Sequence, residues 1–182
     1  TTVISQGSGI FVYNSNLIKK VYFPREILPI STVTAGLINF FISCIIILIF
    51  VLLGGCGISW HLIFLPFIAL IQYIFSLALV FLISALNVYI RDVEYIVVFI
   101  LNMLFYATPV LYSYEMFAGT NLIWLFRLNP MAHLINAYRD IFYVHAMPKI
   151  GNLMIVFGVS ILLLVICYFI FKKLEKRFAE EL

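Results

Sequence analysis

The sequence predicts an all-α integral membrane protein, and two features of its composition support that prediction. Of its 182 residues, 65% are hydrophobic and 10% are charged, whereas soluble domains carry roughly 25% charged residues. From residue 27 to residue 90 the chain contains no Asp, Glu, Lys or Arg at all. A water-facing surface cannot be built from such a stretch, because charged side chains make up much of it. We therefore expect residues 1–182 to form a single transmembrane domain.

Four stretches are apolar and long enough to be membrane spans, since a helix needs about 20 residues to cross roughly 30 Å of hydrocarbon. These stretches cover residues 30–53, 61–87, 95–112 and 152–171, within a residue or two. The run GGCG at 54–57 separates the first two spans, and Pro109 interrupts the third. The second span is longer than a bilayer requires, so it is expected to tilt or to extend into the cytoplasm.

The polar passage before the first span, NSNLIKKVYFPREILP at residues 14–29, is expected to form a short basic helix at the membrane surface. Ser15 or Asn16 can cap its start, and Pro24 biases the preceding residue out of the helical region. Two roles fit such a helix, an anchor on anionic lipid or a docking site for a soluble partner, and spacing alone favours the anchor. Residues 1–13 are expected to be the end of an earlier span, in a chain that is incomplete at its N-terminus.

Between the last two predicted spans, residues 113–150 combine charges with many aromatic side chains, which indicates an external helical segment. The pair Asn129–Pro130 is typical of a helix start, with Asn as the cap and Pro at the first helical position. That helix is too short to cross the membrane, so it should lie in the interface or re-enter partway. Residues 172–182 are predicted to continue the last span as a charged cytoplasmic helix.

The distribution of Lys and Arg predicts the orientation, because cytoplasmic loops carry an excess of both. One side of the membrane would hold Lys19, Lys20, Arg25, Arg91, Lys172, Lys173, Lys176 and Arg177. The other side would hold Arg127, Arg139 and Lys149. Four spans bring both ends of the chain to the same side, so the span count agrees with the charges. The first side is therefore predicted to be cytoplasmic, and the basic residues indicate topology rather than nucleic-acid binding.

Motifs for catalysis are scarce in this sequence. The glycine run GGCG lacks the Lys and the Ser or Thr of a phosphate-binding loop, so ATP hydrolysis is expected on another chain. The three histidines lack the spacing of metal ligands, and no cofactor is expected here. Asp92 and Glu94 could hold a metal–diphosphate, as in some membrane glycosyltransferases. A helix start, where the dipole favours anions, explains these two carboxylates more simply.

Polar side chains recur at helical spacing along three of the predicted spans, and they form a candidate substrate path. Aromatic rings stack on sugar rings, and amides and hydroxyls can bond sugar hydroxyls. The same pattern also suits helix–helix packing, since small and polar residues hold membrane helices together, and the spacing favours packing. The candidate path residues are Asn39, Tyr73, Tyr95, Phe99, Asn102 and Tyr106.

Several motifs give the chain a resemblance to a known family. The segment at residues 14–29 resembles the cytoplasmic coupling segment of bacterial type-2 ABC permeases that export polysaccharides. NVYIRDVEYIV, LFYATPVLYS, LNPMAHLINAYRDIF and FKKLEKRFAEEL resemble later landmarks of that family, in the same order, so nearly the whole chain is covered. LIKKVYFPREI and ALNVYIRDVEYI are the specific motifs among these, since aliphatic spans alone would fit many proteins.

The resemblance implies an ATP-driven exporter of O-antigen, a capsule-like polymer or teichoic acid on a lipid carrier in the bacterial cytoplasmic membrane. It implies two copies of the permease and two ATP-binding subunits, which hold ATP and Mg²⁺. It also implies a coupling helix docked on the ATP-binding subunit, and so reverses the preference for the lipid anchor. The coupling residues would be Leu17, Lys19, Lys20, Val21, Tyr22, Phe23, Arg25 and Glu26, and the turn of Arg91, Asp92 and Glu94 would lie on the same side.

Two other functions stay open at this point. One is a membrane-embedded enzyme that uses Asp92 and Glu94 on a lipid-linked sugar, and the other is an ABC exporter of a small lipophilic substrate.

The family has an interface helix and two further spans at its front, of which this chain carries at most the end of the second. Residues 113–150 would hold re-entrant helices near the exit of the transport path.

Overall fold

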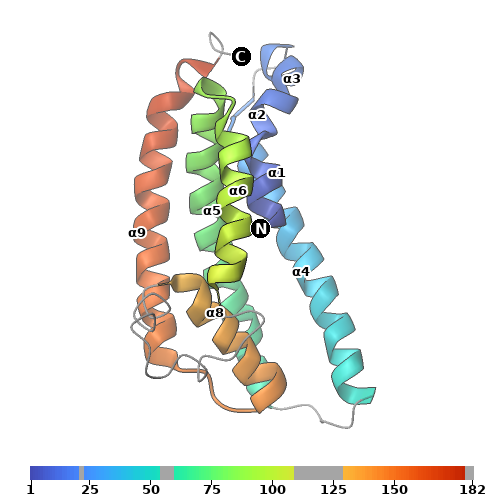
Figure 1. The fold of residues 1–182 in the computed structure, drawn as a ribbon. Helices are drawn as coiled ribbons and strands as arrows, with labels where there is room; N and C mark the ends of the chain where they lie inside the picture. The colour runs from blue at the N-terminus through green and yellow to red at the C-terminus, as the bar shows by residue number, and fades with distance from the viewer. Residues whose placement is uncertain (21–22, 54–59, 109–128, 179–182) are drawn as a thin grey trace.

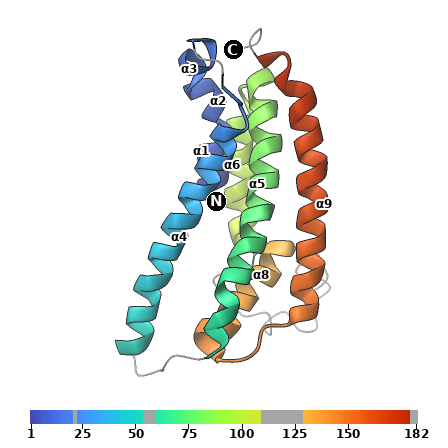
Figure 2. The ribbon, with the colours of Figure 1, turned by 180° about the vertical axis from the view of Figure 1, so that it is seen from behind.

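A computed structural model describes residues 1–20, 23–53, 60–108 and 129–178, and every regular element within them is helical (Figure 1). Three helical units are long and apolar enough to cross a membrane. They are α4 (Ile27–Leu53), the unit of η1 (Trp60–Phe64) with α5 (Leu65–Tyr89), and α9 (Ile150–Glu175). The long helices run side by side, and α4 diverges from α5 toward the end where the two are joined (Figure 2). The predicted all-α membrane fold is confirmed.

The third predicted span corresponds to α6 (Val93–Ala107), a 15-residue apolar helix that is shorter than the other three. Its predicted continuation from Pro109 to Tyr112 lies outside the described residues. The same holds for the GGCG run, for residues 113–128 with Arg127, for Val21 and Tyr22, and for residues 179–182. Of the four predicted spans, three are thus present at spanning length and one is represented by α6.

The first twenty residues form three short helices that lead to one end of the bundle. They are α1 (Thr2–Ser8), α2 (Ile10–Tyr13) and α3 (Ser15–Lys20). Helix α1 begins partway along α5 and rises to α3 (Figure 1), packing against both α5 and α4. Gly36 of α4 makes this close approach possible, because a Cβ at that position would collide with the side chain of Val3.

The buried side chains form two clusters at opposite ends of α5. The larger cluster lies toward α3 and joins α1, α2 and α9 to α5, with Phe11, Phe171 and Phe178 fully buried. The smaller cluster lies toward the other end and joins α5 and α9 to α8 through Ile68, Leu134 and neighbouring apolar residues. α5 is therefore the central helix of the bundle, while most of α4 is exposed, as expected for a helix surrounded by lipid.

Helix α8 (Pro130–Arg139) begins at the predicted Asn129–Pro130 pair. The side-chain oxygen of Asn129 accepts a hydrogen bond from the backbone N–H of Met131 at 2.9 Å, and the amide of Asn129 donates to Thr108 at 3.3 Å. From there α8 runs along α5 toward the end opposite α3 and continues as one π-helical turn, η3 (Asp140–Val144) (Figure 1). The tyrosine hydroxyl of Tyr138 donates to Gln72 of α5 at 2.9 Å.

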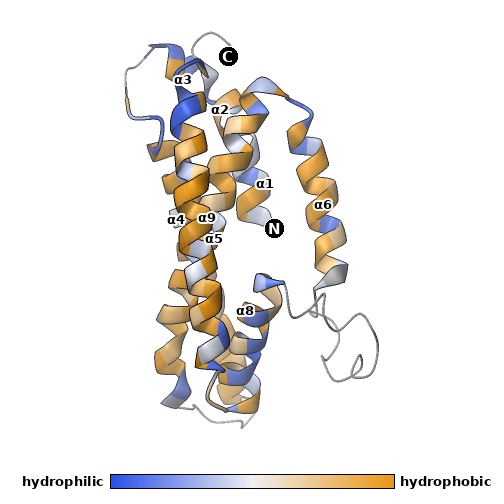
Figure 3. Cartoon of the chain, turned by 90° about the vertical axis from the view of Figure 1, so that its left-hand side faces the viewer, coloured by the Kyte–Doolittle hydropathy of each residue, from blue (hydrophilic) through white to orange (hydrophobic). Residues whose placement is uncertain are grey.

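Hydrophilic residues gather at the two ends of the bundle, whereas the middle of the long helices is hydrophobic (Figure 3). One end holds α3, the turn between α5 and α6, and the end of α9, which is the grouping that the Lys and Arg distribution predicts. The predicted charged helix over 172–182 differs from the structure. α9 ends at Glu175, and the chain then turns so that Phe178 enters the larger core cluster.

Candidate functional site

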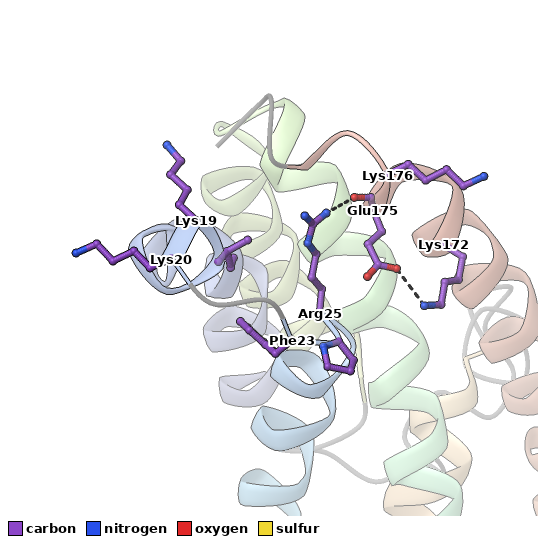
Figure 4. Close-up of a pocket in the computed structure, with 9 residues that line it drawn as sticks. Lys19, Lys20, Phe23, Arg25, Lys172, Glu175 and Lys176 are labelled. Carbon is purple, nitrogen blue, oxygen red and sulfur yellow. Dashed lines mark hydrogen bonds and ion pairs between the residues drawn. The ribbon is translucent and has the colours of Figure 1, made fainter.

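A groove of about 770 Å³ opens at the end of the bundle that carries α3 (Figure 4). Its walls are α3, the link between α3 and α4, and the last turn of α9. The lining residues are Ile18, Lys19, Lys20, Phe23, Pro24, Arg25, Lys172, Glu175 and Lys176. Five of these carry a positive charge and one a negative charge, so the groove attracts anionic groups.

The helix α3 is held by one side chain and exposes the others. Ile18 is buried in the larger core cluster, whereas Leu17 is exposed. Lys19 and Lys20 point away from the bundle (Figure 4), and neither ammonium group bonds to a described residue. The helix thus presents one apolar and two basic side chains outward. Phe23 is partly buried against the core, and Val21 and Tyr22 lie outside the described residues.

Arg25, by contrast, points toward the end of α9 (Figure 4). Its guanidinium donates a hydrogen bond to the backbone carbonyl of Glu175 and lies 5.8 Å from the ring centroid of Phe178. Phe178 is fully buried, with its ring 5.0 Å from that of Phe11 and 5.9 Å from that of Phe171. A cation at the C-terminus of a helix complements the helix dipole. Phe178, which follows α9, therefore packs against the Arg25 side chain on the inner side of the groove.

Glu26 also contacts α9. Its carboxylate forms an ion pair with Lys172 and accepts a hydrogen bond from the hydroxyl of Tyr168 at 3.2 Å. Lys172 pairs with Glu175 as well, at 3.1 Å. The described coupling residues therefore divide into an outward group on α3 and an inward pair, Arg25 and Glu26, which lie in the link before α4 and contact α9.

Sequence reasoning did not identify Tyr168, Lys172 and Phe178 as partners of the coupling segment. Phe178 could have been noticed, because it is the one aromatic residue in the charged run KKLEKRFAEEL. Its contacts with Phe11 and Arg25, however, join residues more than 100 positions apart in the chain, and no local pattern encodes such a pairing.

The predicted turn of Arg91, Asp92 and Glu94 lies at the same end of the bundle, between α5 and α6. Arg91 and Asp92 are exposed, and Asp92 occupies the N-cap position of α6 without a side-chain capping bond. The cap is supplied by Asn87, whose side-chain oxygen accepts from the backbone N–H of Glu94 at 3.0 Å. The Glu94 carboxylate accepts a hydrogen bond from Tyr13 at 2.5 Å. The backbone N–H and the carboxylate of Glu94 thus both hold the start of α6 in place.

Four of the candidate path residues form one exposed face of α6. Tyr95, Phe99 and Tyr106 are 76%, 64% and 71% exposed, and Asn102 is exposed between them. The opposite face of α6 packs on the larger core cluster through Val97 and Leu101. Such a face carries three aromatic rings and an amide, groups that can stack on and hydrogen-bond a sugar.

The other two candidate path residues lie apart from α6. Asn39 is exposed on α4, and the hydroxyl of Tyr73 on α5 lies 3.1 Å from that of Thr34 on α4. Tyr73 also borders a small cavity of about 30 Å³ between α1, α4 and α5. Since α6 stands at the edge of the bundle away from α4 (Figure 3), a single chain does not bring all six residues to one wall.

The described residues contain no group of three or more His, Cys, Asp or Glu side chains that could hold a metal ion. The carboxylate of Glu94 is bonded to Tyr13, and Asp92 lies in solvent. The arrangement around α6 is thus that of a helix start. The chemistry that the described residues support is the binding of anionic or polar groups at the membrane surface, together with helix packing.

Comparison with known proteins identifies the family. The sequence model described as ABC-2 type transporter matches residues 2–143. The chain is 36% identical to the O-antigen export system permease protein RfbA of Myxococcus xanthus, over 100% of this chain and 70% of that protein. Two proteins of the same name from Klebsiella pneumoniae are 33% and 32% identical, over 94% of this chain and 66% of each of them.

These relatives and the apolar helices indicate a multi-pass protein of the bacterial inner membrane. They also favour a transport subunit over a membrane enzyme. The predicted resemblance to type-2 ABC permeases is confirmed. The chain belongs to the ABC-2 type transporter family.

Proposed function

We propose that this chain belongs to the membrane subunit of an ATP-driven exporter that moves a lipid-linked polysaccharide across the cytoplasmic membrane. O-antigen is the polymer that the names of its relatives give. The observation that carries the proposal is the outward face of α3, with Leu17, Lys19 and Lys20 exposed immediately before the link to α4. A helix placed there can receive a force from outside the membrane and pass it to a span.

The force would come from two ATP-binding subunits, which would hold ATP and Mg²⁺, since no phosphate-binding loop is present in this sequence. Binding of ATP would bias a two-state permease toward one of its states through the differential contacts made at α3. The two lysines would meet acidic groups of the partner, while Leu17 would enter an apolar pocket. Apolar anchors contribute most of the affinity of such contacts, and exposed charges contribute less.

The exposed face of α6 would contribute to the wall of the transport path. Tyr95, Phe99, Asn102 and Tyr106 offer rings and an amide to a polymer of sugars, and no other described helix covers this face. A second copy of the permease, bringing its own α6, would close the path. The amide and the tyrosine hydroxyls on this face can form hydrogen bonds in a polar transport path, whereas lipid tails offer them no partners.

Docking of the ATP-binding subunit can be measured by co-purification with the full-length permease in detergent, where the anionic bilayer is absent. Lys19→Glu combined with Lys20→Glu, and separately Leu17→Ala, should each reduce the amount of ATP-binding subunit recovered. The matched control is Lys149→Glu, an exposed lysine at the other end of the bundle. Equal recovery with all of these variants would show that α3 is not the docking helix.

The same variants distinguish docking from a lipid anchor. An anchor held by anionic lipid depends on the charges and little on Leu17, and it leaves recovery in detergent unchanged. A docking helix depends on Leu17 at least as much as on either lysine alone, because single exposed pairs contribute only about 0–1 kcal/mol. At high salt, where charge interactions are screened, the double-lysine variant and the wild type should recover more similar amounts of the ATP-binding subunit.

A further inference from the structure

We propose that the C-terminal end of α9 is a second part of the coupling apparatus, in which Lys172 and Phe178 are positioning residues for the link between α3 and α4. This inference rests on the proposed function. It adds that motion received by α3 reaches α4 and α9 together, because the link runs directly into α4 and Arg25 and Glu26 fasten it to α9.

The first argument concerns the link itself. In the link between α3 and α4, the described residues 23–26 contain no regular helix. Non-helical links absorb motion through changes of a few backbone dihedral angles, which is how hinges work. A docking helix attached only by such a link would turn without moving the span that follows. Transmission therefore needs side-chain contacts that hold the link, and the structure supplies two on α9, one from Arg25 and one from Glu26.

The second argument concerns the end of α9. The last backbone carbonyls of a helix lack hydrogen-bond donors within the helix. At the end of α9, two of these carbonyls accept hydrogen bonds from side chains elsewhere in the chain. Tyr89 of α5 donates to the carbonyl of Leu174 at 2.8 Å, and Arg25 donates to that of Glu175. The end of α9 is thus capped jointly by the central helix and by the coupling link, so these three segments share one junction.

The third argument concerns Phe178. This side chain is fully buried although it follows the end of α9 within a charged run. Its ring contacts those of Phe11, Phe171 and Tyr89, and the Arg25 guanidinium lies over it. An arginine over an aromatic ring is attracted by the ring and also packs its stem against it. Phe178 therefore positions the Arg25 side chain.

The ion pair between Lys172 and Glu26 is only partly buried. Lys172 is 43% exposed, and Glu26 is 24% exposed. Partly exposed ion pairs add little to the stability of a protein, so a variant that lacks this pair is expected to fold and to assemble. If the pair holds the link during motion, its loss should appear in transport and not in assembly.

The experiment uses the full-length permease with its ATP-binding subunit, reconstituted in vesicles. Three quantities are measured, namely co-purification of the subunit, the rate of ATP hydrolysis, and the polymer exported per ATP hydrolysed. Lys172→Met is compared with Lys173→Met, the exposed neighbour that makes no described ion pair. Phe178→Leu is compared with Phe169→Leu, a substitution of an exposed phenylalanine on α9.

Lys172→Met and Phe178→Leu should keep the ATP-binding subunit and hydrolyse ATP at close to the wild-type rate. The polymer exported per ATP should fall, by up to about fivefold for the loss of one partly exposed pair. Lys173→Met and Phe169→Leu should match wild type in all three quantities. Glu26→Gln should lower export per ATP as Lys172→Met does, although Lys172→Met also removes the pair with Glu175. The loss in the double variant should be smaller than the sum of the two single losses, because both changes remove the Glu26–Lys172 contact.

Two outcomes would overturn the inference. Export per ATP that is unchanged in Lys172→Met and Phe178→Leu would show that the junction transmits nothing. A parallel loss of subunit binding and hydrolysis would show that the junction only holds α3 in place for docking. Failure of the proposed function is a different result, since it would appear as unchanged subunit binding in the α3 variants.

Discussion

The side-chain oxygen of Asn87 accepts a hydrogen bond from the backbone N–H of Glu94, 3.0 Å away, so the last turn of α5 caps the first turn of α6. Asn87 is 1% exposed, and the adjacent Val88 belongs to the larger core cluster. The short turn that contains Arg91 and Asp92 is therefore held from within the bundle. This relationship fixes where α6, and with it the exposed aromatic face, leaves α5.

Asn87→Ala should destabilise the permease by about 1–3 kcal/mol, because it leaves a partly buried N–H of α6 without an acceptor. Asp92→Asn, at the exposed N-cap position, should cost about 0.3–1 kcal/mol, since only a dipole interaction is weakened. The measurement is the midpoint of thermal unfolding of the full-length protein in detergent. A larger effect from Asp92→Asn than from Asn87→Ala would contradict the assignment of the cap.

The orientation of the bundle can be tested by cysteine labelling in intact cells. In a background with Cys44, Cys56 and Cys167 replaced by Ser, a cysteine at Lys149 should react with a membrane-impermeant reagent from outside. A cysteine at Lys20 should react only after the cells are opened, because the α3 end carries most of the basic residues. Labelling of position 20 in intact cells would reverse the orientation.

Gly36 of α4 should not tolerate a larger side chain. Gly36→Ala places a methyl group against the side chain of Val3 on α1, and such overpacking costs about 1–3 kcal/mol. Gly158→Ala on α9 is the matched control, because nothing lies within 4 Å of a Cβ added there. The control should be neutral or stabilising by up to about 1 kcal/mol, as expected for Gly→Ala in a helix. Equal unfolding midpoints for the two variants would show that α1 does not pack closely on α4.

Asp140 predicts a pH dependence at the other end of the bundle. Burial raises the pKa of its carboxyl above the ordinary value of 3.8, although the charges of Lys149 and Arg139 act in the opposite direction. A pKa raised in the folded state favours the protonated group, so this contribution to stability is present in acid and lost as the pH rises through the folded pKa.

Asp140→Asn should therefore unfold at a higher temperature than wild type at neutral pH, where Asp140 is charged and partly desolvated. The difference should shrink as the pH falls through the raised pKa of Asp140, because the wild-type carboxyl then becomes protonated. The comparison is made on detergent-solubilised protein with Asp92→Asn, a substitution of an exposed aspartate, as the control. A wild-type protein that is more stable than Asp140→Asn at neutral pH would contradict the direction of the shift.

Several predictions from the sequence depend on local chemistry, and these agree with the structure. The long uncharged stretch from residue 27 to residue 90 contains α4 and α5, because hydrocarbon admits helices without charged side chains. The pair Asn129–Pro130 begins α8, since a cap bond forms between residues two positions apart. The tail is different. A charged helix over 172–182 was expected to continue the last span, but α9 ends at Glu175 and Phe178 beyond it is buried among aromatic rings, while residues 179–182 lie outside the described part of the chain.

The candidate site shows the same division. Exposure of Lys19 and Lys20 follows from the amphipathic pattern of α3. The inward direction of Arg25 does not follow from any pattern, because the neighbouring segment offers no clue that the carbonyl of Glu175 lies within reach. Likewise, the sequence predicted that Asp92 and Glu94 lie at the start of a helix, but it did not predict that the side chain of Asn87 caps α6.

By itself, the sequence determined that this protein is a helical membrane protein, where its spans lie, and which end gathers its basic residues. These properties depend on the transfer of each short segment between water and hydrocarbon, a quantity that adds up along the chain. The tertiary structure alone decided which charges face outward and which are bound within the bundle, as Lys19 and Glu26 illustrate. Those choices depend on which side chains meet across helices, and Glu26 and Lys172 meet only because α4 begins at the end of the bundle where α9 ends.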